Sequence, residues 1–214
     1  MSTIAHVPPN LTTVRAVQQY IAPALTAAAD AIERLRADGP AQESIAKAAG
    51  LLVRCFEAGN RVYACGNGGS LCEAMHIAAE LSGNYRAERA PLPAVAFADP
   101  AYLTCVANDF GFERVFERQV RAHVGEGDVL IAISTSGDSP NIVAAARAAQ
   151  GRGASVVCLT GHAGSALSEV ADVEICTPAG DMSDRVQEQQ VVVVHLLVEL
   201  VERSLFPANY DGAP

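Results

Sequence analysis

The hydrophobic pattern of the first 59 residues is that of two amphipathic helices. Between positions 11 and 36, apolar residues recur at spacings of three and four, which is the period of a helix with one buried face. Pro23 lies inside this segment and is a candidate for a kink or a restart. After a break at Gly39 and Pro40, a second helical pattern covers 42–58, and Gly59 is a candidate C-cap.

The pattern changes after Asn60, where short apolar runs begin to alternate with helical stretches. These runs are apolar throughout, as in parallel strands that are covered on both faces. A chain that alternates strands and helices in this way builds a doubly wound α/β sandwich of three layers. The predicted strands are 61–65, 94–98, 129–134, 155–160 and 173–177, and the predicted helices are 70–82, 101–106, 139–152 and a short one over 165–171.

The segment 183–205 contains a run of four valines but is too long for a strand, so we interpret it as a long C-terminal helix buried on several sides. No internal repeat, low-complexity segment or linker interrupts the chain. The length of 214 residues is that of one domain. We therefore predict a single domain over 1–214, made of N-terminal helices (1–59), an α/β core (60–182) and the C-terminal helix (183–206).

Charge and cysteine usage narrow the function classes. A net charge of −9 gives no field that would draw the protein to nucleic acid or to anionic lipid. We expect no membrane span, because no run of 18 apolar residues occurs, and we recognise no signal peptide. The six cysteines are scattered without a C-x-x-C motif, which predicts buried thiols without a disulfide framework and a cytoplasmic location. An anionic ligand must then be held by a local cradle of neutral donors.

Two predicted strand-to-helix turns contain residues suited to such a cradle. The first is CGNGGS at 65–70, and the second is STSGDSPN at 134–141. Glycines admit a ligand close to the backbone, and the free N–H groups of a helix N-terminus favour an anion. Both turns follow strands, at the edge where open α/β sheets bind ligands. Each turn taken alone is equally well an ordinary tight turn, with Ser139 as a helix N-cap.

Neither turn matches a nucleotide-binding motif. The dinucleotide fingerprint G-x-G-x-x-G and the phosphate loop G-x-x-x-x-G-K-[ST] are both absent. Serine and threonine hydroxyls without a lysine or arginine favour a small phosphate monoester held by hydrogen bonds.

His76 and Glu80 are four residues apart on the helix predicted after the first turn. They therefore share one face of that helix, about 6 Å apart along its axis. Such a pair can bind a metal, act as acid and base, or form a surface hydrogen bond. The pair alone favours the last of these.

Gln187 and His195 lie on the C-terminal helix, and His195 interrupts an otherwise apolar stretch. A buried imidazole there must be hydrogen-bonded, and such a residue is more often part of a core than a ligand. Eight residues of helix rise about 12 Å, so the two side chains cannot reach one atom from the same chain unless the helix is broken. If both serve one site, they come from different subunits, which predicts an oligomer with its active site at the interface.

Other polar residues give weaker signals. His6, His123 and His162 lie in polar or loop contexts and are assigned no role. Asn108 and Asp109 follow a predicted short helix, where they form either a turn or a polar contact.

Five motifs taken together carry a resemblance to a known family. They are CGNGGS (65–70), AMHIAAELSG (74–83), VANDFGF (106–112), ISTSGDSPN (133–141) and RVQE (185–188) followed by His195. In these motifs the chain resembles the sugar isomerase (SIS) domain family and, within it, the phosphoheptose isomerases. The similarity extends over almost the whole chain, from the N-terminal helices to the last helix.

The resemblance implies a flavodoxin-like sandwich with a five-stranded parallel sheet, and a homo-oligomer, a tetramer in the family, with sites between subunits. It implies that Glu80 and His195 are an acid–base pair. It also implies one Zn²⁺ per active site, held by His76, Glu80, Gln187 and His195. The substrate contacts that it implies are Asn67, Gly68, Gly69, Ser70, Glu80, Asn108, Asp109, Ser134, Thr135, Ser136, Ser139 and Gln187.

The activity implied by the resemblance is conversion of sedoheptulose 7-phosphate to D-glycero-D-manno-heptose 7-phosphate through an enediol. Asn84 stands where many members carry Arg, which leaves a second hypothesis open: the same chemistry on another ketose phosphate, such as an octulose 7-phosphate in antibiotic sugar biosynthesis. A third hypothesis is a non-catalytic SIS-type regulator that binds a phosphosugar or a protein, because the C-terminal SLFPANY (204–210) resembles such a relative. The combination of His76, Glu80, Gln187 and His195 argues against this third hypothesis.

Overall fold

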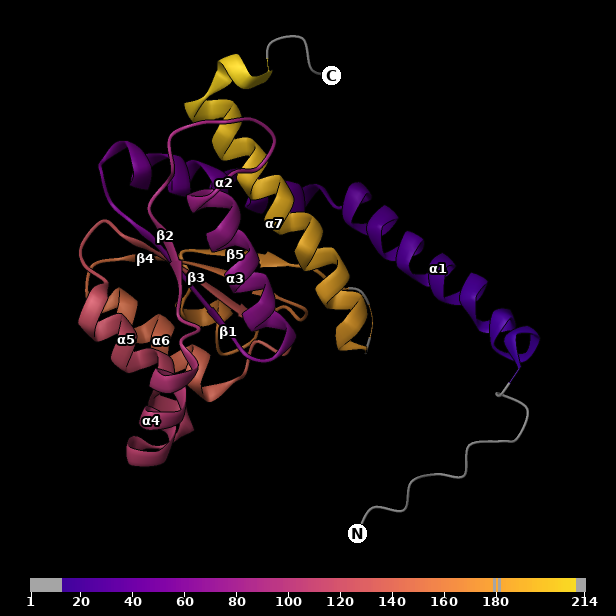
Figure 1. Cartoon of the computed structure of the whole chain (residues 1–214), viewed down its shortest axis with the longest axis horizontal. Helices are drawn as coiled ribbons and strands as arrows, with labels where there is room; N and C mark the ends of the chain where they lie inside the picture. The colour runs from indigo at the N-terminus through magenta and orange to yellow at the C-terminus, as the bar shows by residue number, and fades with distance from the viewer. Residues whose placement is uncertain (1–12, 179, 181, 211–214) are drawn as a thin grey trace.

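Five parallel strands form a central sheet between two layers of helices in the computed structural model, which describes residues 13–178, 180 and 182–210 (Figure 1). The order of the strands is β2-β1-β3-β4-β5, the flavodoxin-like order, so the predicted fold class is confirmed. The strands are β1 (Val62–Gly66), β2 (Ala94–Ala96), β3 (Val129–Ser134), β4 (Ser155–Thr160) and β5 (Val173–Cys176).

The helices that surround the sheet arise from segments of helical periodicity. They are α1 (Val14–Ala37), α2 (Gly39–Glu57), α3 (Gly69–Ser82), α4 (Pro100–Phe110), α5 (Val115–His123), α6 (Pro140–Gln150) and α7 (Ser183–Leu205), with short 3₁₀ turns η2 (Phe112–Arg114), η3 (Ser168–Val170) and η4 (Pro207–Tyr210).

Each face of the sheet has its own hydrophobic core, which explains why the strands are mainly apolar on both faces. Along β3, Ile131 packs with α2, α3 and α7 on one face, whereas Leu130 packs with α5 and α6 on the other. All six residues of β3 and all five of β1 are buried. Because α3 follows β1 on one face and α6 follows β3 on the other, the loops after these neighbouring strands meet at a topological switch point.

Several predicted elements require correction. The helix α5 was not predicted, and α4 continues through Asn108 and Asp109 instead of ending before them. The helix predicted over 165–171 is reduced to the single 3₁₀ turn η3. The start predicted at residue 11 lies outside the described residues, and α1 begins at Val14, with the Thr13 side chain capping it.

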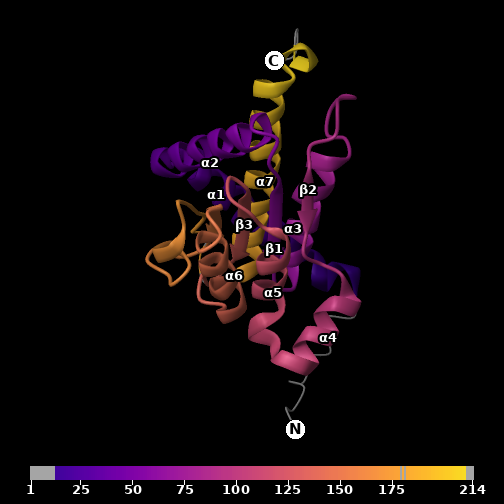
Figure 2. The ribbon, with the colours of Figure 1, turned by 90° about the vertical axis from the view of Figure 1, so that its left-hand side faces the viewer.

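Two helices lie apart from the sheet. In both views α4 lies at the lower end of the molecule, and in Figure 1 α1 extends away from the body (Figures 1 and 2). The apolar side chains of Val14, Tyr20, Ile21 and Leu25 on α1 are more than half exposed. No helix in the described part of the chain has the length and apolar character needed to cross a membrane.

Candidate active site

The two loops at the switch point are joined by a reciprocal pair of amide hydrogen bonds. The Nδ2 of Asn67 donates to Oδ1 of Asn141 over 2.9 Å, and the Nδ2 of Asn141 donates to Oδ1 of Asn67 over 2.8 Å. Gly68 adopts a positive φ of 55° at the start of α3, a conformation that a residue with a Cβ rarely takes. Predicted substrate contacts at 67–70 and at 134–139 therefore lie in two loops that are fastened together.

Hydroxyl groups gather in the loop after β3. The Ser134 hydroxyl lies 3.2 Å from that of Ser139 and 3.4 Å from that of Ser136, and it accepts a hydrogen bond from the N–H of Gly137 at 3.1 Å. Pro140 begins α6 and Ser139 occupies the N-cap position, as predicted, although the Ser139 side chain makes no capping hydrogen bond. This arrangement leaves hydroxyl groups together at a helix N-terminus, which favours an oxyanion.

A cavity of about 210 Å³ opens beside this loop, and its lining includes Thr135, Ser136, Ser183 and His162. Gly161, which precedes His162, allows the chain to pass close to the loop after β3. Its N–H donates to the carbonyl of Thr135 at 2.9 Å, and a Cβ at position 161 would lie 2.7 Å from the same oxygen. His162 thus borders the loop that carries the hydroxyl groups, although no sequence motif pointed to it.

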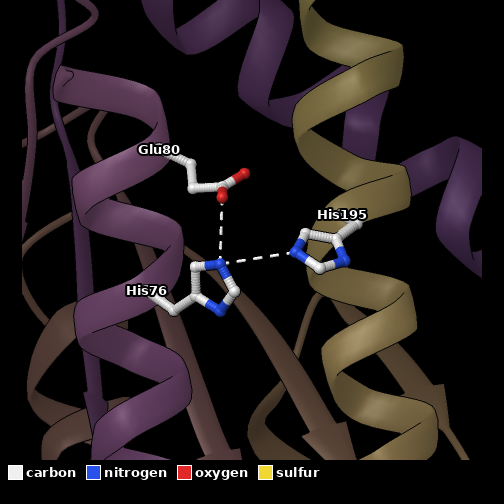
Figure 3. Close-up of side chains that lie close together, drawn as sticks. All are labelled: His76, Glu80 and His195. Carbon is white, nitrogen blue, oxygen red and sulfur yellow. Dashed lines mark hydrogen bonds and ion pairs between the residues drawn. The ribbon is translucent and has the colours of Figure 1, made fainter. Parts of the chain in front are cut away.

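His76, Glu80 and His195 form one cluster between α3 and α7 (Figure 3). The Nε2 of His76 lies 2.9 Å from Oε1 of Glu80 and 3.3 Å from Nε2 of His195. The Oε2 of Glu80 is buried and has no hydrogen-bond partner among the described residues. The spacing along one helix predicted the His76–Glu80 pair, and the family resemblance implied that His195 joins it, although His195 follows Glu80 by 115 residues.

An aromatic ring supports the imidazole of His195. The ring of Tyr85 stacks on it, with ring centroids 6.0 Å apart and planes inclined by 28°. The guanidinium of Arg86 lies 5.3 Å from the Tyr85 ring centroid and pairs with Glu199 of α7 at 2.7 Å. Sequence reasoning missed Tyr85, because no motif marks a ring that contacts a histidine 110 positions away.

Gln187 does not join this cluster within one chain. Its amide lies against Gly69 at the start of α3, where a Cβ would clash with it. Because α7 is unbroken from Ser183 to Leu205, His195 lies about two turns further along and contacts His76 instead. The separation of Gln187 from His195 that was predicted from the rise of eight helical residues is therefore present.

A groove of about 370 Å³ separates the start of α7 from α3, with Gln187, His76 and the acidic Glu73 and Asp184 in its lining. Glu73 is buried, and its Oε2 has no hydrogen-bond partner in the part of the chain that the structure describes. Burial raises the pKa of Glu73 to about 8. Glu73 was not singled out from the sequence, because a single carboxylate on a helix usually faces water.

Asn108 and Asp109 are not brought to the cluster. Both are exposed at the end of α4, where the Nδ2 of Asn108 donates to Oδ1 of Asp109 at 2.8 Å. Within one chain the structure thus brings the two loops together, and it brings His76, Glu80 and His195 together in a separate cluster. Asn108 and Asp109 lie apart from both groups.

The donor set of the cluster fits a zinc ion. Two imidazole nitrogens and a carboxylate oxygen all lie within 4.8 Å of one another, and all three are common zinc ligands. The separation of 3.3 Å between the two imidazole nitrogens equals the ligand-to-ligand distance, about 3.3 Å, of a tetrahedron with bonds of about 2.0 Å. The partnerless Oε2 of Glu80 also leaves that carboxylate with unused capacity to accept a ligand.

Comparison with known proteins identifies the family. Residues 18–161 match the SIS domain. The chain belongs to the SIS domain family. Over 188 residues this SIS protein is 47% identical to the phosphoheptose isomerase of Proteus mirabilis, a match covering 88% of this chain and 98% of that protein.

Solved SIS structures agree with this assignment. The phosphoheptose isomerase GmhA of Neisseria gonorrhoeae superposes with a TM-score of 0.80 at 34% identity, covering 87% of this chain and 98% of that one. A phosphoheptose isomerase of Francisella tularensis superposes with a TM-score of 0.77 at 36% identity, covering 90% and 100%. The predicted family is confirmed, and such relatives imply that this SIS protein is an enzyme, a sugar-phosphate isomerase.

Proposed function

We propose that this SIS protein interconverts sedoheptulose 7-phosphate and D-glycero-D-manno-heptose 7-phosphate, with Glu80 and His195 as its acid–base pair. The observation that carries the proposal is the cluster of one carboxylate and two imidazoles, which the fold assembles from α3 and α7. The names of the relatives, phosphoheptose isomerases at up to 47% identity, support the choice of substrate. The cluster supports catalysis over a purely regulatory role, because binding alone does not require an acid and a base.

The residues have complementary parts in the reaction. Aldose–ketose isomerisation moves a proton between C1 and C2 through an enediol, so it needs a base at carbon and an acid at the oxygens. Glu80 removes the carbon-bound proton in this scheme, and His195 transfers protons at O1 and O2 or opens the sugar ring. Tyr85, stacked on His195, limits how far that imidazole can turn.

The phosphate is proposed to bind at the loop after β3. Ser134, Thr135, Ser136 and Ser139 supply hydroxyl groups there, at the positive end of the α6 dipole. His162 borders the same cavity, and its imidazole ring adds a hydrogen-bond donor to these hydroxyl groups. A protein with a net charge of −9 can hold a phosphorylated sugar in this way without a basic surface.

Zinc is proposed as the cofactor of the cluster. His76, Glu80 and His195 would hold it, and Gln187 would reach it from a second copy of the chain. Bound zinc polarises a carbonyl oxygen as a Lewis acid. Ligation of Glu80 and His195 would compete with their use as acid and base, so metal content and turnover must be measured on the same preparation.

We propose a homo-oligomer, with a tetramer as the family's arrangement, whose sites combine residues of different copies. The exposed apolar side chains of Val14, Tyr20, Ile21 and Leu25 give α1 a face that a second copy can cover. A shared site also accounts for Asn108, Asp109 and Gln187, which one chain does not bring to its own cluster.

The test is a panel of ketose phosphates of seven and eight carbons, assayed in deuterium oxide with identification of the product. We expect turnover of sedoheptulose 7-phosphate with solvent deuterium at C2 of the aldose, and loss of both turnover and labelling in Glu80→Gln. The matched control is Glu88→Gln, a change at an exposed carboxylate in the loop after α3. Wild-type turnover in Glu80→Gln would disprove the role of Glu80.

The same panel separates the alternatives. Preference for an eight-carbon substrate would favour the octulose phosphate hypothesis that Asn84 motivates. Absence of turnover on every member, with retained binding of a phosphosugar, would favour a regulator.

A further inference from the structure

The last turn of α3, which carries Glu80, depends on a residue outside the helix. The helix ends at Ser82 with no basic residue in its last turn, and the N–H of Gly83 bonds only to the carbonyl of Ala79. Arg89 donates to the next two carbonyls: its Nη2 to that of Glu80 and its Nη1 to that of Leu81, both at 2.7 Å. The carbonyl of Leu81 also accepts from the backbone N–H of Leu92 at 3.0 Å, so Arg89 contributes most to the carbonyl of Glu80. Arg89 therefore completes the hydrogen bonding of the turn and places a positive charge at the negative end of the helix.

Arg89 is itself held from the other helix. Its Nε donates to Oε1 of Glu202 on α7 at 2.7 Å, and the two side chains are 1% and 0% exposed. The hydroxyl of Tyr210 donates to the second oxygen of Glu202 at 2.9 Å, and the ring of Phe206 lies 5.7 Å from the guanidinium. A buried ion pair whose groups are all hydrogen-bonded in this way is costly to break from either side.

The position of Glu202 along α7 gives this link a geometric consequence. Glu202 follows His195 by seven residues, close to two full turns, so both side chains point to the same side of α7. His195 contacts His76 on α3, and Glu202 contacts the end of α3 through Arg89. Two connections about 10 Å apart along α7 fix both the distance and the rotation of one helix against the other.

We infer that Arg89 is a positioning residue that, anchored by Glu202 and Tyr210, fixes the last turn of α3 and so aims Glu80 relative to His195. The inference rests on the proposed role of Glu80 as the base. It extends that role to three residues with buried side chains outside the cluster of His76, Glu80 and His195. Misplacing a catalytic group by about 1 Å can lower a rate by about 100-fold, so the link controls the rate of proton transfer more than it controls binding.

The decisive variant is Arg89→Lys, which keeps a charge beside Glu202 but cannot form the planar fork that reaches Glu202 and two carbonyls together. We expect kcat to fall by about tenfold or more, with KM within about twofold, because the proposed phosphate loop belongs to other elements. The kinetic isotope effect with ketose phosphate deuterated at C1 should rise, because proton transfer then limits the rate. Tyr210→Phe removes one hydrogen bond and should give a smaller change in the same direction if Arg89→Lys fails to fold. The matched control is Arg121→Lys on α5, where Arg121 pairs with Glu117 at 2.7 Å on the surface.

Hydrogen exchange supplies a readout that needs no turnover. Amides of residues 80–84 should exchange faster in Arg89→Lys, whereas those of the first turns of α3 should not. A lower melting temperature with unchanged kcat and isotope effect would mean that Arg89 is only structural and would overturn the inference, as would uniform exchange along α3. If the wild type turns over no ketose phosphate, the proposed function fails, and the exchange pattern still decides whether Arg89 holds the turn of Glu80.

Discussion

Glu73 gives the protein a pH-dependent stability that one substitution should remove. Its carboxyl lies buried in the groove between α3 and α7, and within residues 13–178, 180 and 182–210 its Oε2 has no hydrogen-bond partner. Burial disfavours the charged form and raises the pKa of Glu73 from its ordinary 4.5 to about 8. In the unfolded chain the same carboxyl ionises freely, so the folded protein binds the proton more tightly than the unfolded one.

The sign and size of the effect follow from this difference. Below pH 4.5 both states are protonated and Glu73 does not affect the free energy of unfolding. Between pH 4.5 and about 8 only the unfolded state ionises, so stability falls by about 1.4 kcal/mol for each pH unit. At pH 7 the loss amounts to about 3 kcal/mol, which is a large part of the stability of a single domain.

The assay compares wild type with Glu73→Gln by urea denaturation between pH 4 and pH 8 at a fixed protein concentration. Glutamine has nearly the same shape and never ionises, so the variant should match wild type near pH 4 and exceed it by about 3 kcal/mol at pH 7. The same change at the exposed Glu126 controls for the loss of one negative charge. Parallel pH profiles for wild type and Glu73→Gln would refute the reasoning.

Three further outcomes test the site. In steady-state kinetics, His162→Gln should raise KM for the sugar phosphate by about threefold to tenfold and leave kcat unchanged. The reason is that a hydrogen bond to a charged group is worth about 1.5–3 kcal/mol when buried and less at the surface. An unchanged KM would show that His162 does not contact the phosphate. Gly161→Ala should lower the free energy of unfolding, measured by urea denaturation, by about 1–3 kcal/mol, because its Cβ would lie 2.7 Å from the carbonyl oxygen of Thr135. An unchanged free energy of unfolding would show that the loop can move to accommodate the Cβ. Chelation should lower the melting temperature of protein that contains zinc, and added zinc should restore it in wild type but not in His76→Gln; a metal-free, fully active preparation would contradict the zinc proposal.

The fold was largely predictable because the strands are buried on both faces. The ranges of β3, β4 and α7 agree with those expected from the hydrophobic runs at 129–134, 155–160 and 183–205. The helix α5 escaped prediction because it has only nine residues and its apolar positions stand among charged ones, so the periodic signal was too short. The segment of η3 forms a single turn instead of a longer helix because a side chain competes for its backbone hydrogen bonds. The Ser165 hydroxyl accepts from the N–H of Ser168.

The site was predictable where its residues share one helix or one loop. The spacing of His76 and Glu80 placed them on one face of α3, and the rise of α7 separated Gln187 from His195. Contacts that depend on how distant elements pack left no sequence signal: Tyr85 against His195, and Arg89 against Glu202 across 113 positions.

The reciprocal amide pair of Asn67 and Asn141 has a consequence for how a ligand is admitted. Each side chain uses one donor and one acceptor on the other, and an amide does not ionise, so this link between the two loops does not depend on pH. The loops are thereby preorganised: a ligand that bridges them loses little conformational entropy on binding, and its affinity reflects contacts instead of loop closure. Selectivity between sugar phosphates then depends on the length of the ligand that fits between the two loops.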